Sequence, residues 1–126
     1  MRLIWICLGG ACGTGARYLL SSWVLRQLGP GFPYGTLAVN LIGSFLLGVV
    51  MHLGLTTQTI SPELRLVLGT GVLGGFTTYS TFNYETLQYL EEGAWLLGAL
   101  NVAATLLLCL LGGVCGVACA RWAVGR

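Results

Sequence analysis

The chain has 126 residues and a net charge of +2; 56% of its residues are hydrophobic and only 8% are charged. A soluble domain carries roughly a quarter charged residues, so this composition excludes an ordinary water-soluble protein and predicts a multi-pass protein of the plasma or inner membrane. One histidine and no cluster of nucleophile and base argue against an enzyme. We expect the lipid bilayer as its surroundings and no nucleic-acid partner.

Scarce charges and prolines divide the chain into four apolar stretches. A membrane-spanning helix needs about 20 mostly apolar residues, and the sequence predicts such helices near residues 3–25, 34–55, 64–90 and 94–121. The expected fold is therefore an all-α membrane protein, with residues 1–126 forming a single integral membrane domain. Four short helices enclose little interior, so we expect a pore to require a second copy of the chain.

Pairs of small residues at four-residue spacing occur on these predicted helices. They are Gly9/Gly13, Gly71/Gly75 and Gly112/Gly116, with Ser44/Gly48 as a weaker case. Such faces let helix backbones approach closely. Packing within one chain and packing between two copies explain them equally well.

Arg17 lies in the second half of the first predicted span. An ionisable residue inside a membrane is costly and is a functional candidate by default. Arg17 could attract an anion into a vestibule, or its long side chain could reach the interface or cap carbonyls of a neighbouring helix. The sequence leaves these roles open.

Two matched polar stripes lie on the second and fourth predicted spans, with residues recurring every four positions. They are Thr36, Asn40 and Ser44, and Asn101, Thr105 and Cys109. Residues at this spacing share a helix face, and amides and hydroxyls donate hydrogen bonds without carrying charge. Interhelical hydrogen bonding would explain a single such residue, whereas two matched stripes favour a pathway that holds an ion loosely.

The third predicted span contains the run from Gly74 to Phe82. Its two adjacent glycines weaken a helix. Five hydroxyl residues follow, namely Thr77, Thr78, Tyr79, Ser80 and Thr81. We predict that this helix is broken near Gly74–Thr81, because backbone groups freed at bilayer depth need polar partners and irregular backbone there lines a cavity or pathway.

Two aromatic residues and one acid accompany the predicted break. Tyr79 and Phe82 share a helix face and could turn their electropositive ring edges toward an anion, with ordinary packing as the alternative. Glu85 could pair with Arg17, bond a hydroxyl or take part in ion movement. No carboxylate cluster is available for a cation and hydrogen-bond donors dominate the polar positions, so an anion is the favoured ligand.

Three motifs occur in order along the chain. They are Gly9-Gly10 through Gly15-Ala16-Arg17-Tyr18, the run from Gly35 to Phe45, and the run from Gly74 to Phe82. Together they resemble the CrcB/Fluc fluoride channel family over essentially the whole chain. The resemblance implies a passive, fluoride-selective channel that exports cytoplasmic fluoride, confers fluoride resistance and works as an antiparallel dimer with two pores.

The resemblance also implies roles for particular residues. Asn40 would hydrogen-bond fluoride, Phe82 would offer its ring edge to the ion, and Thr105 would continue the polar track. The expected ion pathway comprises Asn40, Tyr79, Ser80, Thr81, Phe82, Asn101 and Thr105, with Arg17 and Glu85 as vestibule charges.

A structural sodium ion at the dimer centre is implied as well, held by the backbone carbonyls of Gly74 and Thr77. One position departs from the family pattern, because Tyr79 stands where phenylalanine is usual. We expect this extra hydroxyl to affect the conduction rate rather than selectivity.

The arginines are unevenly distributed between the two membrane sides. Arg26 lies on one side, and the other side has Arg2, Arg65, Arg121 and Arg126. This count favours a cytoplasmic amino terminus, whereas an antiparallel homodimer requires dual topology. The resemblance makes the homodimer the default, with pairing to an oppositely inserted homologue as the alternative.

Two other function classes are alternatives to a channel. A proton-coupled small multidrug-type exporter would need an acid in the first span, which has none. A non-conducting accessory membrane subunit would leave the polar stripes and the helix break unexplained. The fluoride channel is therefore the favoured function.

Overall fold

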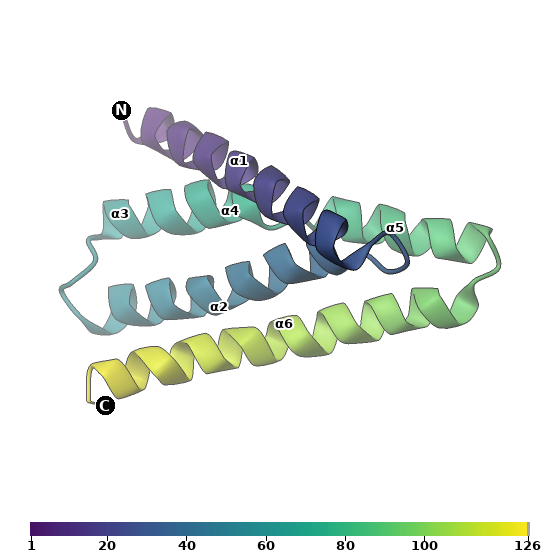
Figure 1. Ribbon diagram of the computed structural model, residues 1–126. Helices are drawn as coiled ribbons and strands as arrows, with labels where there is room; N and C mark the ends of the chain where they lie inside the picture. The colour runs from purple at the N-terminus through teal and green to yellow at the C-terminus, as the bar shows by residue number, and fades with distance from the viewer. Residues whose placement is uncertain (126) are drawn as a thin grey trace.

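The structure is a computed structural model that describes residues 1–125, so Arg126 of the charge count lies outside the described residues. It is all-helical (Figure 1). The elements are α1 (Arg2–Leu28), α2 (Tyr34–Thr56), α3 (Pro62–Leu66), the π-helix η1 (Val67–Leu73), α4 (Gly74–Phe76), α5 (Tyr79–Glu91) and α6 (Trp95–Ala123). The expected all-α membrane fold is confirmed, because α1, α2 and α6 are each long and apolar enough to cross a bilayer and α3 to α5 form the broken third span.

Local sequence explains where the helices begin and end. Gly29 follows α1 with a φ of 76°, a left-handed conformation that glycine adopts at little cost. Ser61 caps α3 by accepting a hydrogen bond from the Leu64 amide at 3.2 Å, and Pro62 occupies the first helical position, where its missing N–H is not needed. These signals place the connections at the bundle ends.

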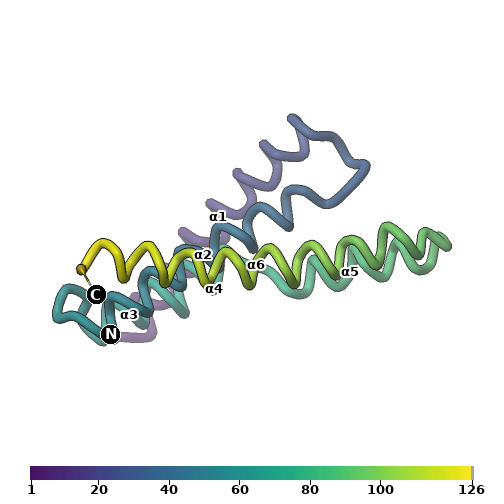
Figure 2. Tube along the Cα trace, turned by 90° about the horizontal axis from the view of Figure 1, so that it is seen from below, coloured from purple at the N-terminus to yellow at the C-terminus, as the bar shows by residue number. Residues whose placement is uncertain are grey.

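The helices pack in an interleaved order. The main partner of α1 is the first half of the third span, and the main partner of α2 is α6. Figure 2 shows that α1 and the start of α2 lean away from α5 and the adjoining start of α6. The hydroxyl of Tyr89, near the end of α5, donates to the carbonyl of Gly31 in the connection between α1 and α2 at 3.2 Å. This hydrogen bond links the two diverging helix pairs.

The small-residue faces are used for packing inside the chain. A Cβ added at Gly13 would overlap the Val72 carbonyl, and one added at Gly75 would lie 2.5 Å from the Gly10 carbonyl oxygen. On the other side of the bundle, a Cβ at Gly116 would overlap the Phe45 carbonyl. Backbone therefore contacts backbone at both interfaces, which is how small residues favour helix association in lipid.

The third span is broken within the predicted region, but not at its glycines. Gly74 and Gly75 are helical, and the extended residues are Thr77 and Thr78. The π-helix η1 immediately before this segment was not anticipated. The glycine pair serves the contact with α1, and the break comes after it.

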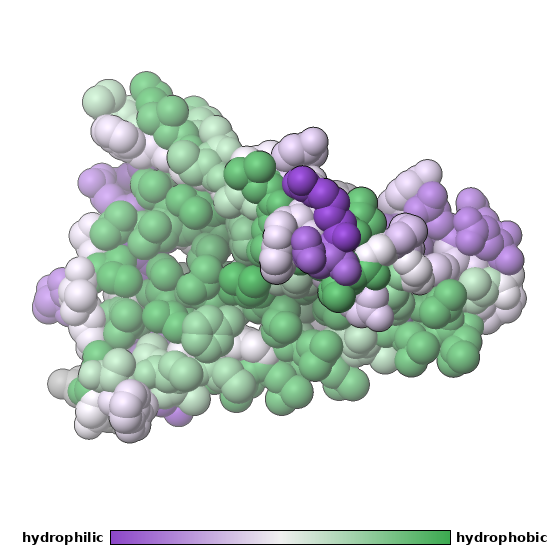
Figure 3. Space-filling model, viewed as in Figure 1, coloured by the Kyte–Doolittle hydropathy of each residue, from purple (hydrophilic) through white to green (hydrophobic). Residues whose placement is uncertain are grey.

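The molecular surface suits a bilayer. Figure 3 shows a largely hydrophobic surface, with hydrophilic residues at the two ends of the view and one hydrophilic patch in its upper middle. At one end Arg2 pairs with Glu63 at 3.4 Å, and Arg65 donates to the Gly54 carbonyl at 2.7 Å. Fully buried side chains are scarce, Val39 and Asn101 being the largest of those described. The chain is an integral membrane protein with little interior of its own.

Candidate functional site

The break in the third span is held by one side chain of α2. The Thr78 amide donates to Asn40 Oδ1 at 2.7 Å, and Asn40 Nδ2 donates to the Thr78 carbonyl at 2.9 Å. In a continuous helix the Thr78 amide would donate to the Gly74 carbonyl instead. Asn40 thus replaces the lost helical hydrogen bond, and the Gly74 carbonyl is released.

The hydroxyls at the break complete this local structure. Thr78 Oγ1 caps α5 by accepting from the Thr81 amide at 3.3 Å, and it donates to Thr81 Oγ1 at 2.9 Å. Thr77 Oγ1 donates to the Leu73 carbonyl at 2.9 Å. Ser80 is exposed, with its hydroxyl 3.5 Å from that of Thr78. A threonine just before a helix is a standard N-cap, so Thr78 was recognisable from the sequence.

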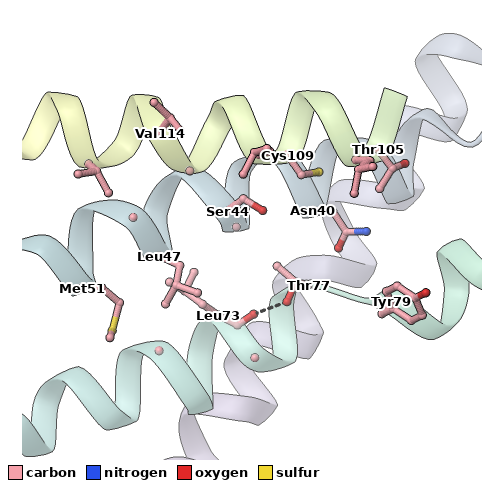
Figure 4. Close-up of a pocket in the computed structure, with 18 of the residues that line it drawn as sticks. Asn40, Ser44, Leu47, Met51, Leu73, Thr77, Tyr79, Thr105, Cys109 and Val114 are labelled. Atoms are coloured by element: carbon pink, nitrogen blue, oxygen red, sulfur yellow. Dashed lines mark hydrogen bonds between the residues drawn. The ribbon is translucent and has the colours of Figure 1, made fainter. Parts of the chain in front are cut away.

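A groove of about 1260 Å³ runs beside the break, between α2, the third span and α6. Figure 4 shows Asn40 and Ser44 on α2 facing Thr105 and Cys109 on α6, with Thr77 across from them. The last two residues of each predicted stripe therefore line one shared groove. Most of the remaining lining is apolar, and no carboxylate lines the groove among the described residues.

Both predicted aromatic residues line this groove. Their ring centroids are 5.6 Å apart with an interplanar angle of 65°, an edge-to-face arrangement. Phe82 is 9% exposed and Tyr79 is 77% exposed. The Phe82 ring is therefore held in place by its surroundings, while Tyr79 stands at the open side of the groove.

A smaller cavity of about 260 Å³ lies on another side of the break, and Arg17, Thr36, Thr78 and Thr81 help to line it. Arg17 Nη1 donates to the Thr77 carbonyl at 3.4 Å. Thr36 Oγ1 donates to Glu85 Oε1 at 2.5 Å. Of the three partners considered for Glu85, the structure selects a hydroxyl, and within residues 1–125 no ion pair joins Glu85 to Arg17.

Asn101 lies outside both cavities. It is 1% exposed, and its Nδ2 donates to Thr86 Oγ1 at 3.0 Å between α5 and α6. Thr86 in turn donates to the Phe82 carbonyl at 2.9 Å. Sequence reasoning did not single out Thr86, which has no repeated partner on its own helix to mark it. In this structure Asn101 ties α6 to the helix that carries Phe82.

A membrane bundle with a broken span beside a donor-lined groove belongs to the class of small channel or transport proteins. The family model described as "CrcB-like protein, Camphor Resistance (CrcB)" matches residues 4–117. The chain belongs to this CrcB family, as its motifs indicated.

Curated relatives match over nearly their full length. A protein of Sorangium cellulosum is 58% identical over 120 residues, covering 95% of this chain and 94% of the relative. One of Anaeromyxobacter dehalogenans is 52% identical over 124 residues, covering 98% of each. A third, of Geobacter sulfurreducens, is 52% identical over 116 residues, covering 92% and 94%. All three relatives are named "Fluoride-specific ion channel FluC", a channel rather than an enzyme.

Proposed function

We propose that this chain is a fluoride-selective ion channel through which cytoplasmic fluoride leaves by passive electrodiffusion, giving resistance to fluoride. The observation that supports it most is the donor-lined groove at the helix break, in a chain about half or more identical to relatives named as fluoride channels. The groove combines uncharged donors, aromatic rings and no lining carboxylate, which is the chemistry an anion requires.

Fluoride must exchange part of its hydration shell for protein donors on this path. An asparagine amide has two N–H donors, and one of those of Asn40 is used on the Thr78 carbonyl. The second is available to the ion, and the Thr105 hydroxyl on the opposite wall supplies another donor. Uncharged donors bind an anion weakly enough for it to leave again, which conduction requires.

A second copy of the chain would close the groove, which is open along one side. The pairs Gly9/Gly13, Gly71/Gly75 and Gly112/Gly116 are already packed within the chain, and we assign the groove face to a partner. We propose an antiparallel homodimer, with an oppositely inserted homologue as the alternative. Cross-linking in membranes should give a species of twice the chain mass; a strictly monomeric yet conducting protein would contradict this.

The break also suits a structural sodium ion. The Gly74 carbonyl has lost its helical donor to Asn40, and Gly74 and Thr77 both line the groove. The Thr77 carbonyl accepts only a long hydrogen bond from Arg17, so it retains acceptor capacity. Released carbonyls are hard oxygen ligands, and a bound Na⁺ would be coordinated by them. Replacing sodium by a large organic cation in all buffers should lower flux; unchanged flux would argue against the site.

The test of the proposed function is ion efflux from liposomes that contain the purified protein. Vesicles are loaded with potassium fluoride or potassium chloride in a sodium-containing buffer, a potassium ionophore is added, and the released anion is followed with an ion-selective electrode. Fast fluoride release with little chloride release, and without a proton gradient, is expected. Release of neither ion would favour a missing partner chain or an accessory subunit, and release that needs a proton gradient would favour an exporter.

Replacing Phe82 with isoleucine is expected to lower fluoride efflux roughly three- to tenfold, because an aromatic edge contact is worth about 0.5–1.5 kcal/mol. Tyr79→Phe serves as the comparison, since it keeps the ring and removes only the hydroxyl; it should change the rate by about twofold at most. The same efflux assay measures both. Equal rates in Phe82→Ile and unmodified protein would remove the aromatic rings from the mechanism.

A further inference from the structure

The groove has a charged residue at one end. Arg121, in the last turn of α6, lines it together with Met51 of α2 and the neighbouring Ala118. Of the described residues that line the groove, Arg121 alone carries a charge. Figure 1 shows the end of α6 at the same end of the bundle as the amino terminus and the connection between α2 and α3.

Arg121 also differs from the other arginines in its contacts. Within residues 1–125, the other arginines bond to Glu63 (Arg2), the Thr77 carbonyl (Arg17), the Ser22 carbonyl (Arg26) and the Gly54 carbonyl (Arg65). Within residues 1–125, Arg121 has neither a hydrogen bond nor an ion pair from its side chain. Its guanidinium is exposed and is therefore available to a mobile anion.

The acids of the chain do not neutralise this end of the groove. Glu63 is paired with Arg2, Glu85 bonds Thr36 beside the break, and Glu91 and Glu92 lie at the end of α5. The last residues of α5 and the last residues of α6 lie at opposite ends of the bundle (Figure 1). Among residues 1–125, the acidic side chains are therefore either paired or distant from this end of the groove, where Arg121 carries a positive charge.

We propose that Arg121 captures anions at the mouth of the groove, raising the local fluoride concentration before the ion reaches Thr105 and Asn40. This inference rests on the proposed channel function. Arg121 lies sixteen residues after Thr105 on one helix, about 24 Å away, so it acts by long-range attraction and does not contact the ion at the break. Low-dielectric walls focus such a field, and salt screens it.

The competing role for an arginine at the end of a span is to anchor the helix in the lipid headgroups. Arg26 provides a matched control, because it is also exposed, lies in the last turn of α1 and does not line the groove. If arginine acts only as a lipid anchor, Arg26 and Arg121 have the same role, each at its own end of the bundle. Capture of the permeating anion is expected of Arg121 alone.

The experiment compares Arg121→Gln, Arg121→Lys and Arg26→Gln in fluoride-loaded liposomes. Initial efflux of a few millimolar fluoride is measured at an ionic strength of about 0.01 M, where the Debye length is about 30 Å, and at about 0.3 M, where it is below 10 Å. The added salt is potassium gluconate. At low salt Arg121→Gln should be slower than unmodified protein by roughly two- to fivefold, and at high salt the two rates should converge.

Arg121→Lys should retain the unmodified rate, and Arg26→Gln should leave the salt dependence unchanged. Equal rates for Arg121→Gln and Arg26→Gln at low salt would overturn the proposal. So would a loss in Arg121→Gln that is the same at both ionic strengths, since that is the result of poor insertion. Failure of the channel function itself is distinguished by the absence of fluoride efflux from unmodified protein.

Discussion

Replacing Asn40 with aspartate is expected to reduce fluoride efflux roughly 100-fold. The carboxylate can still accept from the Thr78 amide, but it cannot donate to the Thr78 carbonyl, which Asn40 Nδ2 contacts at 2.9 Å. A buried carbonyl left without its donor costs about 1–3 kcal/mol, and a negative charge beside the groove repels an anion. Liposome efflux measures the loss.

Asn40→Ala separates these two causes, because it removes both hydrogen bonds and adds no charge. We expect it to conduct roughly tenfold more slowly than unmodified protein, between the aspartate variant and the original. Size-exclusion chromatography of each variant checks that the protein is folded. Undiminished efflux in Asn40→Asp would show that Asn40 neither holds the conducting form of the break nor faces the ion.

Replacing Gly13 with alanine is expected to destabilise the bundle by about 2–3 kcal/mol, the cost of forcing extra volume into a packed interface. The added Cβ would overlap the Val72 carbonyl. That obstacle is backbone, which cannot move aside as a flexible side chain can. The measurement is the temperature at which detergent-solubilised protein loses its monodisperse chromatographic peak.

Gly15→Ala is the matched control, since it is the same substitution two residues further along α1. A Cβ at Gly15 has nothing within 4 Å, and alanine is favoured over glycine inside a helix by roughly 0.5–1 kcal/mol. The control should therefore be as stable as the original protein or slightly more so. Similar melting temperatures for the two variants would mean that α1 does not approach the third span as closely as described.

Hydropathy was enough to predict the spans, the run of hydroxyl residues marked the region of the break, and glycine spacing predicted the small-residue faces. They could not predict which faces meet, because α1 packs on the third span through contacts about sixty residues apart in sequence. The π-helix η1 has no sequence marker in this chain. Its hydrogen bonds span one more residue than those of an α-helix, and the segment lies against α1.

Only part of each predicted polar stripe lies on the groove. Four helical residues turn through 400°, so a three-member stripe drifts by about 80° from its first residue to its last. Thr36 and Asn101, the first members, accordingly leave the groove for partners at Glu85 and Thr86. The pairing of Asn40 with Thr78 spans 38 residues, and no local pattern reveals such a contact.

The interleaved packing sets an order for assembly during membrane insertion. Asn40 precedes Thr78 in the chain, so the amide that satisfies the break is already in the bilayer when the third span emerges. The surface of α1 around Gly13, which contacts the third span, is likewise in the membrane before the third span is synthesised. The polar backbone of the break, which is costly in lipid, therefore finds its hydrogen-bond partner as soon as it enters the membrane. The last helix synthesised, α6, then adds the remaining wall of the groove.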